Sequence, residues 1–307
     1  MLSQSSLDLQ KPVSKSVFIK KIIAAFRPKT LTAALVPCLA GSALYYGLHQ
    51  SIDFQVLCFA LISSFCIQIG TNLVNDSVDF KKGADTSERI GPERITASGI
   101  LSAKTVMLIA GFFFLLAVLF GLPLVFKGGL PIIILGLISV FMGYSYTAGP
   151  FPLAYLGLGD LFVVLFFGFV AVGGIYFLNG SSIDVNVLVL GAQIGLHAAV
   201  LIAINNLRDI EGDQKVSKKT LAVRLGIQKS RFLIGGYIFV PFILSVFWIH
   251  AGHPLCFVLP LLSLPLGIKI IRDVYTTLPS PIYNQFLARS AGLHLAFGLL
   301  TSIGFIL

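Results

Sequence analysis

The sequence predicts an all-α, polytopic membrane protein, because its composition is too apolar for a water-soluble fold and its apolar residues lie in helix-length segments. Of the 307 residues, 56% are hydrophobic and only 11% carry a charge, against about 25% charged residues in an average soluble domain. So few charges cannot cover the surface of a soluble domain. This excludes an ordinary cytosolic enzyme, a coiled coil, a disordered chain and a secreted disulfide scaffold.

A helix needs about 20 mostly apolar residues to cross the hydrocarbon core of a bilayer. Nine segments meet this requirement and predict a bundle of nine transmembrane helices: residues 30–49, 53–74, 104–126, 129–146, 159–179, 184–206, 232–250, 254–272 and 286–307. Residues 1–29 are polar and basic, and predict a cytoplasmic tail with an amphipathic lead-in on an anionic membrane surface. We therefore expect this tail and one transmembrane domain, residues 30–307.

The basic residues predict the orientation of the chain in the membrane. Of the 22 Lys and Arg residues, 21 lie in residues 1–29, 75–104, 207–231 and 269–289, and only Lys127 lies in another connection. With nine crossings these four segments share one side, which the positive-inside rule makes the cytoplasm. The N-terminus is thus predicted to be cytoplasmic. The net charge of +9 is interpreted as a topology signal, and no nucleic-acid partner is expected.

Two long cytoplasmic connections, residues 75–103 and 207–231, hold eight of the 13 acidic residues. The pattern Asn-x-x-x-Asp, followed by a second acid, lies at the start of each connection. The residues concerned are Asn72, Asp76 and Asp79 in the first pattern, and Asn205, Asp209 and Asp213 in the second. If each helix continues through its pattern, these side chains share one helix face. Such a repeat is typical of membrane proteins that bind a ligand between two halves.

Two facing groups of carboxylates repel each other and require a compensating cation. Oxygen-rich sites of Asp and Asn suit Mg²⁺, which binds a few carboxylates together with substrate phosphates. Neighbouring Lys and Arg side chains can neutralise the rest of a diphosphate. Because an apolar bundle lies next to this charged end, the sequence predicts a diphosphate with a lipid tail, namely a prenyl diphosphate.

Two other interpretations stay open at this point. Acidic residues at helix ends can be solvated caps, and basic loops can serve topology alone. A cation-coupled membrane transporter would also use acidic residues, although these normally lie near the bilayer midplane. Asp160 is the only acid near the interior of a predicted span.

The motifs resemble those of the UbiA superfamily of intramembrane aromatic prenyltransferases, and within it the 1,4-dihydroxy-2-naphthoate polyprenyltransferase (MenA) branch. The similarity covers nearly the whole chain from Phe26. It rests on RPKT at 27–30, NDSVDFKKGAD at 75–85, RIGP at 89–92, YTAGPFPLAYLGLGD at 146–160, NNLRDIEGD at 205–213 and KKTLAVRLG at 218–226. Two positions depart from the usual pattern: Ser217 replaces a common Gly, and Phe151 replaces a basic or polar residue.

The resemblance implies nine helices around a central cavity and transfer of a polyprenyl group to 1,4-dihydroxy-2-naphthoate, with loss of diphosphate and CO₂, in menaquinone biosynthesis. It also implies that Mg²⁺ is the cofactor. The lipid bilayer, a prenyl diphosphate and an aromatic acceptor would be the partners, and a bacterial plasma membrane with the active site toward the cytoplasm would be the location. Another acceptor, either a different quinone precursor or a glycerol-phosphate lipid, stays open.

Site residues carry over from the family motifs position by position. The resemblance implies that Mg²⁺ is held by Asp76, Asp79, Asp209 and Asp213, supported by Asn72 and Asn206. It suggests diphosphate contacts from Lys29, Arg94, Arg208 and Lys218. Tyr144 and Tyr146 would face the allylic cation and the acceptor, since a cation is attracted to an aromatic ring; alternatively, both tyrosines belong to the aromatic belt at the membrane surface.

The predicted topology can be tested with reporter insertions. If the asymmetry of Lys and Arg governs insertion, reporters placed within residues 83–95 and within residues 212–220 will both be cytoplasmic. A reporter within residues 180–183 will lie on the opposite side. Accessibility of each reporter in intact cells is the measurement. Finding the two acidic connections on opposite sides would contradict both the topology and a shared site.

Overall fold

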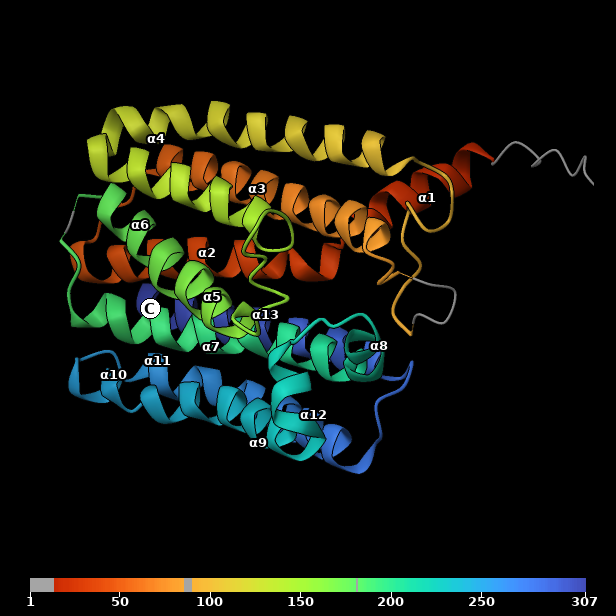
Figure 1. The fold of residues 1–307 in the computed structure, drawn as a ribbon. Helices are drawn as coiled ribbons and strands as arrows, with labels where there is room; N and C mark the ends of the chain where they lie inside the picture. Colours follow the sequence, from red (N-terminus) through yellow and green to blue (C-terminus); the bar gives the residue numbers. More distant parts are fainter. Residues whose placement is uncertain (1–13, 86–89, 181) are drawn as a thin grey trace, which may run out of the picture.

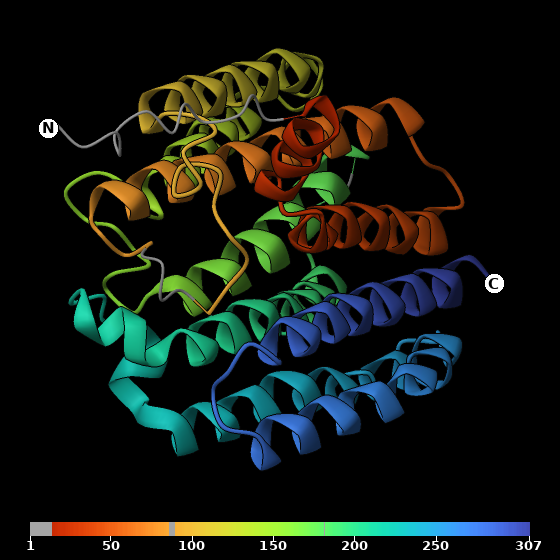
Figure 2. The same ribbon diagram turned by 90° about the vertical axis from the view of Figure 1, so that its right-hand side faces the viewer.

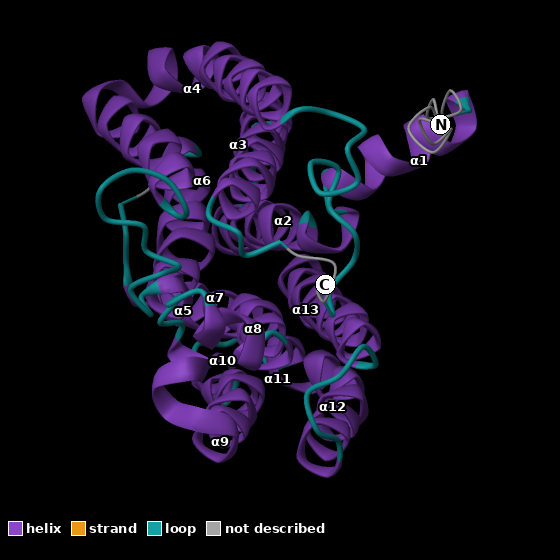
Figure 3. Cartoon of the chain, turned by 45° about the vertical axis from the view of Figure 1, so that its right-hand side comes forward, coloured by secondary structure: helices purple, strands orange, loops and turns teal. Residues whose placement is uncertain are grey.

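The computed structural model describes residues 14–85, 90–180 and 182–307, and these residues form helices and connecting loops without a strand (Figure 3). The first 13 residues of the predicted tail and Arg89 of the RIGP motif lie outside the described residues. The helices are α1 Lys15–Ala25, η1 Pro28–Thr30, α2 Thr32–His49, α3 Phe54–Lys81, α4 Ala103–Ser145, α5 Gly159–Val163, η2 Val164–Val170, α6 Ala171–Leu178, α7 Val185–Arg208, α8 Ile210–Lys215, α9 Leu221–Leu244, α10 Phe247–His250, α11 Leu255–Val258, η3 Leu259–Ser263, α12 Leu264–Thr276 and α13 Tyr283–Ile306. The all-α prediction is confirmed.

The helix count of the described chain does not by itself test the predicted nine membrane spans. In the described chain seven helices are long and apolar enough to cross a membrane, and α1–η1 with α2, bent by 45°, adds an eighth. The difference lies at α4, which runs over 43 residues with a non-helical Gly129 inside. A straight helix of that length would be about 64 Å long, twice the ~30 Å hydrocarbon core. Figure 1 shows α4 doubling back on itself, so it covers two of the predicted segments. The count of nine and the side of the N-terminus stay predictions.

Both acidic patterns begin on long helices, as their spacing required. Helix α3 continues to Lys81 and so includes the whole first pattern. In the second pattern α7 ends at Arg208, Asp209 forms the junction, and α8 carries Asp213. Much of the predicted connection 207–231 is helical, since it contains α8 and the first turns of α9. Helix α9 begins after Thr220, whose hydroxyl accepts a hydrogen bond from the Val223 amide.

The chain forms two groups of helices, which Figure 2 shows as a red-to-green group above a teal-to-blue group. Glycines allow α7 to approach the π-helical segment η2 closely. A Cβ atom on Gly168 would lie 2.3 Å from the Gly191 carbonyl oxygen and 2.9 Å from the Gly195 Cα atom. Small residues at helix crossings are the usual means of close packing in membranes. This crossing joins the two groups beside the functional cavity.

We predict that Gly168→Ala destabilises the protein, because the added methyl group meets backbone atoms that cannot rotate away. Overpacking of this kind costs about 1–3 kcal/mol. The measurement is the thermal unfolding midpoint of the purified protein. Gly236→Ala in α9 is the matched control, since a Cβ atom there meets nothing within 4 Å. An unchanged midpoint in Gly168→Ala would show that the crossing is looser than described.

Candidate active site

A cavity of about 700 Å³ extends from the two acidic patterns into the bundle and is lined by helices of both groups. Its polar end contains side chains from α3, α7, α8 and the neighbouring loops. Its far end is apolar and is lined by Leu124, Ile132 and Leu178. Along α3 the lining runs from Ala60 to Asp79, about 28 Å at 1.5 Å per residue. The cavity thus suits a long amphiphile with a charged head group.

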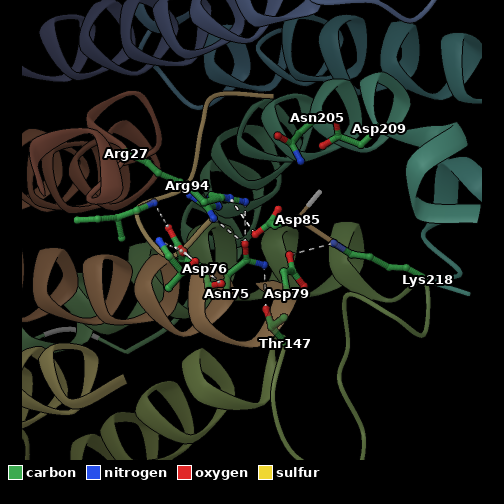
Figure 4. Close-up of polar contacts among 12 residues, drawn as sticks. Arg27, Asn75, Asp76, Asp79, Asp85, Arg94, Thr147, Asn205, Asp209 and Lys218 are labelled. Atoms are coloured by element: carbon green, nitrogen blue, oxygen red, sulfur yellow. Dashed lines mark hydrogen bonds and ion pairs between the residues drawn. The ribbon is translucent and has the colours of Figure 1, made fainter. Parts of the chain in front are cut away.

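Asn75 on α3 connects two arginines at the polar end (Figure 4). Its Oδ1 atom accepts hydrogen bonds from Arg27 Nη2 at 2.6 Å and from Arg94 Nη2 at 3.0 Å, and its Nδ2 atom donates to Thr147 Oγ1 at 3.0 Å. The side chain therefore gathers two guanidinium groups at the cavity wall. Sequence reasoning placed Arg94 here but omitted Asn75 and Arg27, although both belong to the quoted motifs.

Asp76 and Asn72, one turn apart on α3, attach other segments to this helix. Asp76 is 1% exposed and accepts hydrogen bonds from the Ile95 amide at 3.2 Å, the Thr96 amide at 3.3 Å and the Thr96 hydroxyl. Asn72 donates to the Phe26 carbonyl and to Thr30 Oγ1. Asp76 thus lines the cavity while its carboxylate fixes the segment that follows Arg94 to α3.

Lys218 lies between the two acidic patterns. Its Nζ atom is 3.4 Å from Asp79 Oδ2 and 3.7 Å from Asp213 Oδ1. Asp79 also accepts a hydrogen bond from the Tyr155 hydroxyl at 2.8 Å. Burial and the adjacent Asp79 carboxylate raise the pKa of Tyr155, and burial lowers the pKa of Lys82. The structure thus brings acids from α3 and α8 to one lysine, as the shared-site hypothesis requires.

Arg208 determines the geometry of the second pattern. It is 1% exposed and binds Asp209 through two hydrogen bonds of 2.8 and 2.6 Å. It also donates to Asn205 Oδ1 at 2.9 Å and to Asn284 Oδ1 at 2.7 Å. Most of its five N–H groups are therefore committed to protein partners. Arg208 therefore orients Asp209 and also lines the cavity, and the diphosphate contact expected of it stays a prediction.

The remaining predicted residues divide into two groups. Lys29, Tyr146 and Asn206 line the cavity. Tyr144 does not; it is 42% exposed, and its placement in the cavity was wrong. Two residues that are two positions apart on a helix point about 200° apart, so both tyrosines cannot face one cavity. Phe151 is also strongly exposed, at 73%, and does not line the cavity.

The donor set fits Mg²⁺ by its chemistry, because the polar end offers carboxylate and amide oxygens. In the described part of the chain, no three His, Cys, Asp or Glu side chains lie close enough to hold an ion by themselves. This arrangement suits Mg²⁺, which commonly takes one or two carboxylates and completes its octahedron with water and substrate phosphates. Ser217 has a φ of 56°, a left-handed backbone conformation that glycine adopts without strain. This explains why Gly is common at the position before Lys218.

A helical bundle whose cavity joins a charged, oxygen-rich end to an apolar interior suits an amphiphilic ligand with an anionic head group. Residues 34–288 match the UbiA prenyltransferase family, and the chain belongs to this family. It is thus a prenyltransferase by family. Each motif that suggested this assignment from sequence contributes at least one residue to the cavity lining.

Known proteins similar to this chain agree with the assignment. The chain is 39% identical over 218 residues to the 1,4-dihydroxy-2-naphthoate octaprenyltransferase of Haemophilus influenzae, covering 67% of this chain and 69% of that protein. It is 32% identical to the Bacillus subtilis protein of the same name, covering 92% and 90%. A UbiA homolog from Archaeoglobus fulgidus bound to DMAPP and Mg²⁺ shares the fold, with a TM-score of 0.59 at 16% identity over 92% of this chain and 99% of that chain.

Proposed function

We propose that this protein transfers a polyprenyl group from a prenyl diphosphate to 1,4-dihydroxy-2-naphthoate in menaquinone biosynthesis. The observation that carries the proposal is the single cavity with a charged head-group end and an apolar interior. Two relatives at 39% and 32% identity bear the name of this activity. In the reaction the allylic C–O bond to diphosphate breaks and a ring carbon bonds to the prenyl carbon. The carboxylate on that ring carbon then leaves as CO₂ and returns its bonding electrons to the ring.

Mg²⁺ would be held by carboxylates drawn from Asp76, Asp79, Asp209 and Asp213, with one or two of them on each ion and the substrate phosphates completing its coordination. Asn72 and Asn206 line the same end of the cavity and would support the water shell. When bound, Mg²⁺ neutralises charge on the diphosphate and makes it a better leaving group. The structure of a relative bound to DMAPP and Mg²⁺ supports the choice of metal.

The cations of the chain would supply the rest of the diphosphate site. Lys218, Arg94 and Lys29 line the cavity together with Arg27. Fixed cations stabilise the negative charge that grows on diphosphate as the allylic bond breaks. Arg27 and Arg94 are held in place for this purpose by Asn75. Such prearranged charge needs little movement during the reaction.

The prenyl tail would lie in the apolar part of the cavity. Tyr146 lines the cavity, and its hydroxyl oxygen would lie 2.9 Å from a Cβ atom built on Gly159. A ring so placed near the reacting carbon would stabilise an allylic cation through its π-system. The acceptor would enter at the charged end, where the carboxylate of the naphthoate can meet arginine side chains.

We further propose that the acidic end faces the cytoplasm of a bacterial plasma membrane. The Lys and Arg residues near that end support this orientation. Residues 1–29 would then form the cytoplasmic tail and membrane-surface lead-in, and residues 30–307 the transmembrane enzyme domain. Helix α1 is consistent with the lead-in, since it exposes Val17, Phe18, Ile19 and Ile23 beside its lysines.

The proposed activity predicts a defined product. Purified protein given one prenyl diphosphate and 1,4-dihydroxy-2-naphthoate will form prenylated naphthoquinol lacking the carboxylate, and chelation of Mg²⁺ will abolish the product. Mass spectrometry of the lipid extract is the measurement. A 4-hydroxybenzoate arm and a glycerol-phosphate arm serve as alternative acceptors. Product in either of those arms alone would replace the naphthoate assignment, and no product in any arm would contradict the proposed activity.

We expect that removing one acidic charge from the site causes a large loss of turnover. Asp76→Asn and Asp209→Asn each keep the side-chain shape but lose a carboxylate that serves one metal–diphosphate assembly, and each should lower kcat about 10²–10³-fold. Because groups that act as a unit are not additive, the double variant should be little worse than either single variant. Prenyl transfer at saturating Mg²⁺ is the measurement.

The control for these variants is Asp273→Asn in α12, an acid paired with Arg289 outside the cavity lining. It changes the same chemical group and should leave turnover nearly normal. Insertion and folding of every variant are checked first. Near-normal turnover in Asp76→Asn or Asp209→Asn would mean that these acids only hold neighbouring segments in place, without a part in the reaction.

A further inference from the structure

The loop between α4 and α5 is attached to the segment that follows α8. The Tyr155 carbonyl accepts a hydrogen bond from the Lys219 amide at 3.2 Å, and the Leu156 carbonyl accepts one from Arg224 Nη2 at 2.9 Å. Gly157 has φ +72°, and a Cβ atom there would lie 2.8 Å from the Lys219 carbonyl oxygen. The two segments therefore approach so closely that only glycine fits at this point.

The Tyr155 side chain extends from this attachment to the first acidic pattern. Its hydroxyl donates to Asp79 Oδ1 at 2.8 Å, while Lys218 lies 3.4 Å from the other oxygen of the same carboxylate. The Lys82 Nζ atom lies 3.9 Å from the centre of the Tyr155 ring, and the Lys218 Nζ atom lies 5.2 Å from it. One aromatic side chain thus contacts an acid of the first pattern and the lysine that bridges to the second.

These contacts have a consequence for charge at the site. Asp79 is 1% exposed, so its carboxylate depends on protein donors. With the Tyr155 hydroxyl present, the Asp79 carboxylate accepts one hydrogen bond from this neutral donor and one from Lys218. The Nζ atom of Lys218 also lies 3.7 Å from Asp213 Oδ1. Without the hydroxyl, the buried carboxylate would depend more strongly on Lys218. Lys218 and Asp79 would then pair with each other and both become less available to a metal–diphosphate head group.

We propose that Tyr155 is a positioning residue that aligns Asp79 and holds Lys218 between the two acidic patterns, so that both act on the same diphosphate. This inference rests on the proposed function and names a residue that the motif comparison did not assign to the site. The ring supports the lysines through cation–π contacts, and the hydroxyl supports the acid. The two contributions can be separated by substitution.

The experiment compares Tyr155→Phe, which removes the hydroxyl alone, with Tyr155→Leu, which also removes the ring. Tyr144→Phe is the matched control, since Tyr144 is exposed and lies outside the cavity lining. The backbone bonds of residues 155 and 156 do not involve the hydroxyl, so Tyr155→Phe should fold normally. Its thermal unfolding midpoint checks this.

The main readout is binding of inorganic diphosphate in the presence of Mg²⁺, measured by calorimetry on the full-length protein. Tyr155→Phe should weaken binding roughly 10- to 150-fold, the range for losing one hydrogen bond to a charged group, and Tyr155→Leu should weaken it further. In turnover assays KM for the prenyl diphosphate should rise in Tyr155→Phe while KM for the acceptor stays unchanged. A fall in kcat with unchanged diphosphate affinity would overturn the proposal.

The failure of this inference and the failure of the proposed function give different results. If the unsubstituted protein binds Mg²⁺ and diphosphate but forms no naphthoquinol, the acceptor assignment is wrong and the Tyr155 comparison still stands. If the unsubstituted protein and Tyr155→Phe bind diphosphate equally well, Tyr155 does not position the site, whatever the acceptor.

Discussion

Burial of the Asp76 and Asp79 carboxylates at the end of an apolar bundle is the constraint around which this structure is arranged. Both side chains are 1% exposed, and a buried carboxylate is costly unless donors or cations satisfy it. Asp76 is satisfied by the segment that follows Arg94, and Asp79 by Tyr155 and Lys218. Segments from three other regions of the chain therefore converge on the last two turns of α3.

This convergence also concentrates positive charge where a diphosphate would bind. Asn75 gathers Arg27 and Arg94 on one side, and Lys218 lies between the patterns on the other. The cavity continues from this charged end into an apolar interior that reaches Leu124 and Leu178. A reactive allylic cation formed there would be shielded from water by the bundle, which protects it from hydrolysis.

Close helix contacts maintain this geometry without large side chains. Glycines on η2 and α7 let the two helix groups meet beside the cavity, and Gly157 lets the Tyr155 loop reach the segment after α8. In a membrane, where burial of apolar surface gives little drive to helix association, such packing contributes much of the stability. The site is therefore positioned by backbone proximity at a few glycines as much as by its own polar contacts.

The sequence by itself determined the all-α class, the membrane setting and the pairing of the two acidic patterns, because these follow from composition and from i, i+4 spacing, which are local properties. Only the tertiary structure decided which polar side chains meet. Asn75, Arg27 and Tyr155 act through partners distant in the chain. Tyr146 lines the cavity and Tyr144 does not, because residues two positions apart along a helical turn point in different directions. The hydrogen bonds from Arg208 to Asp209 and Asn284 also needed the folded chain. Hydrogen-bond partners and helix rotation are set by packing, and a single sequence does not encode them in any local pattern.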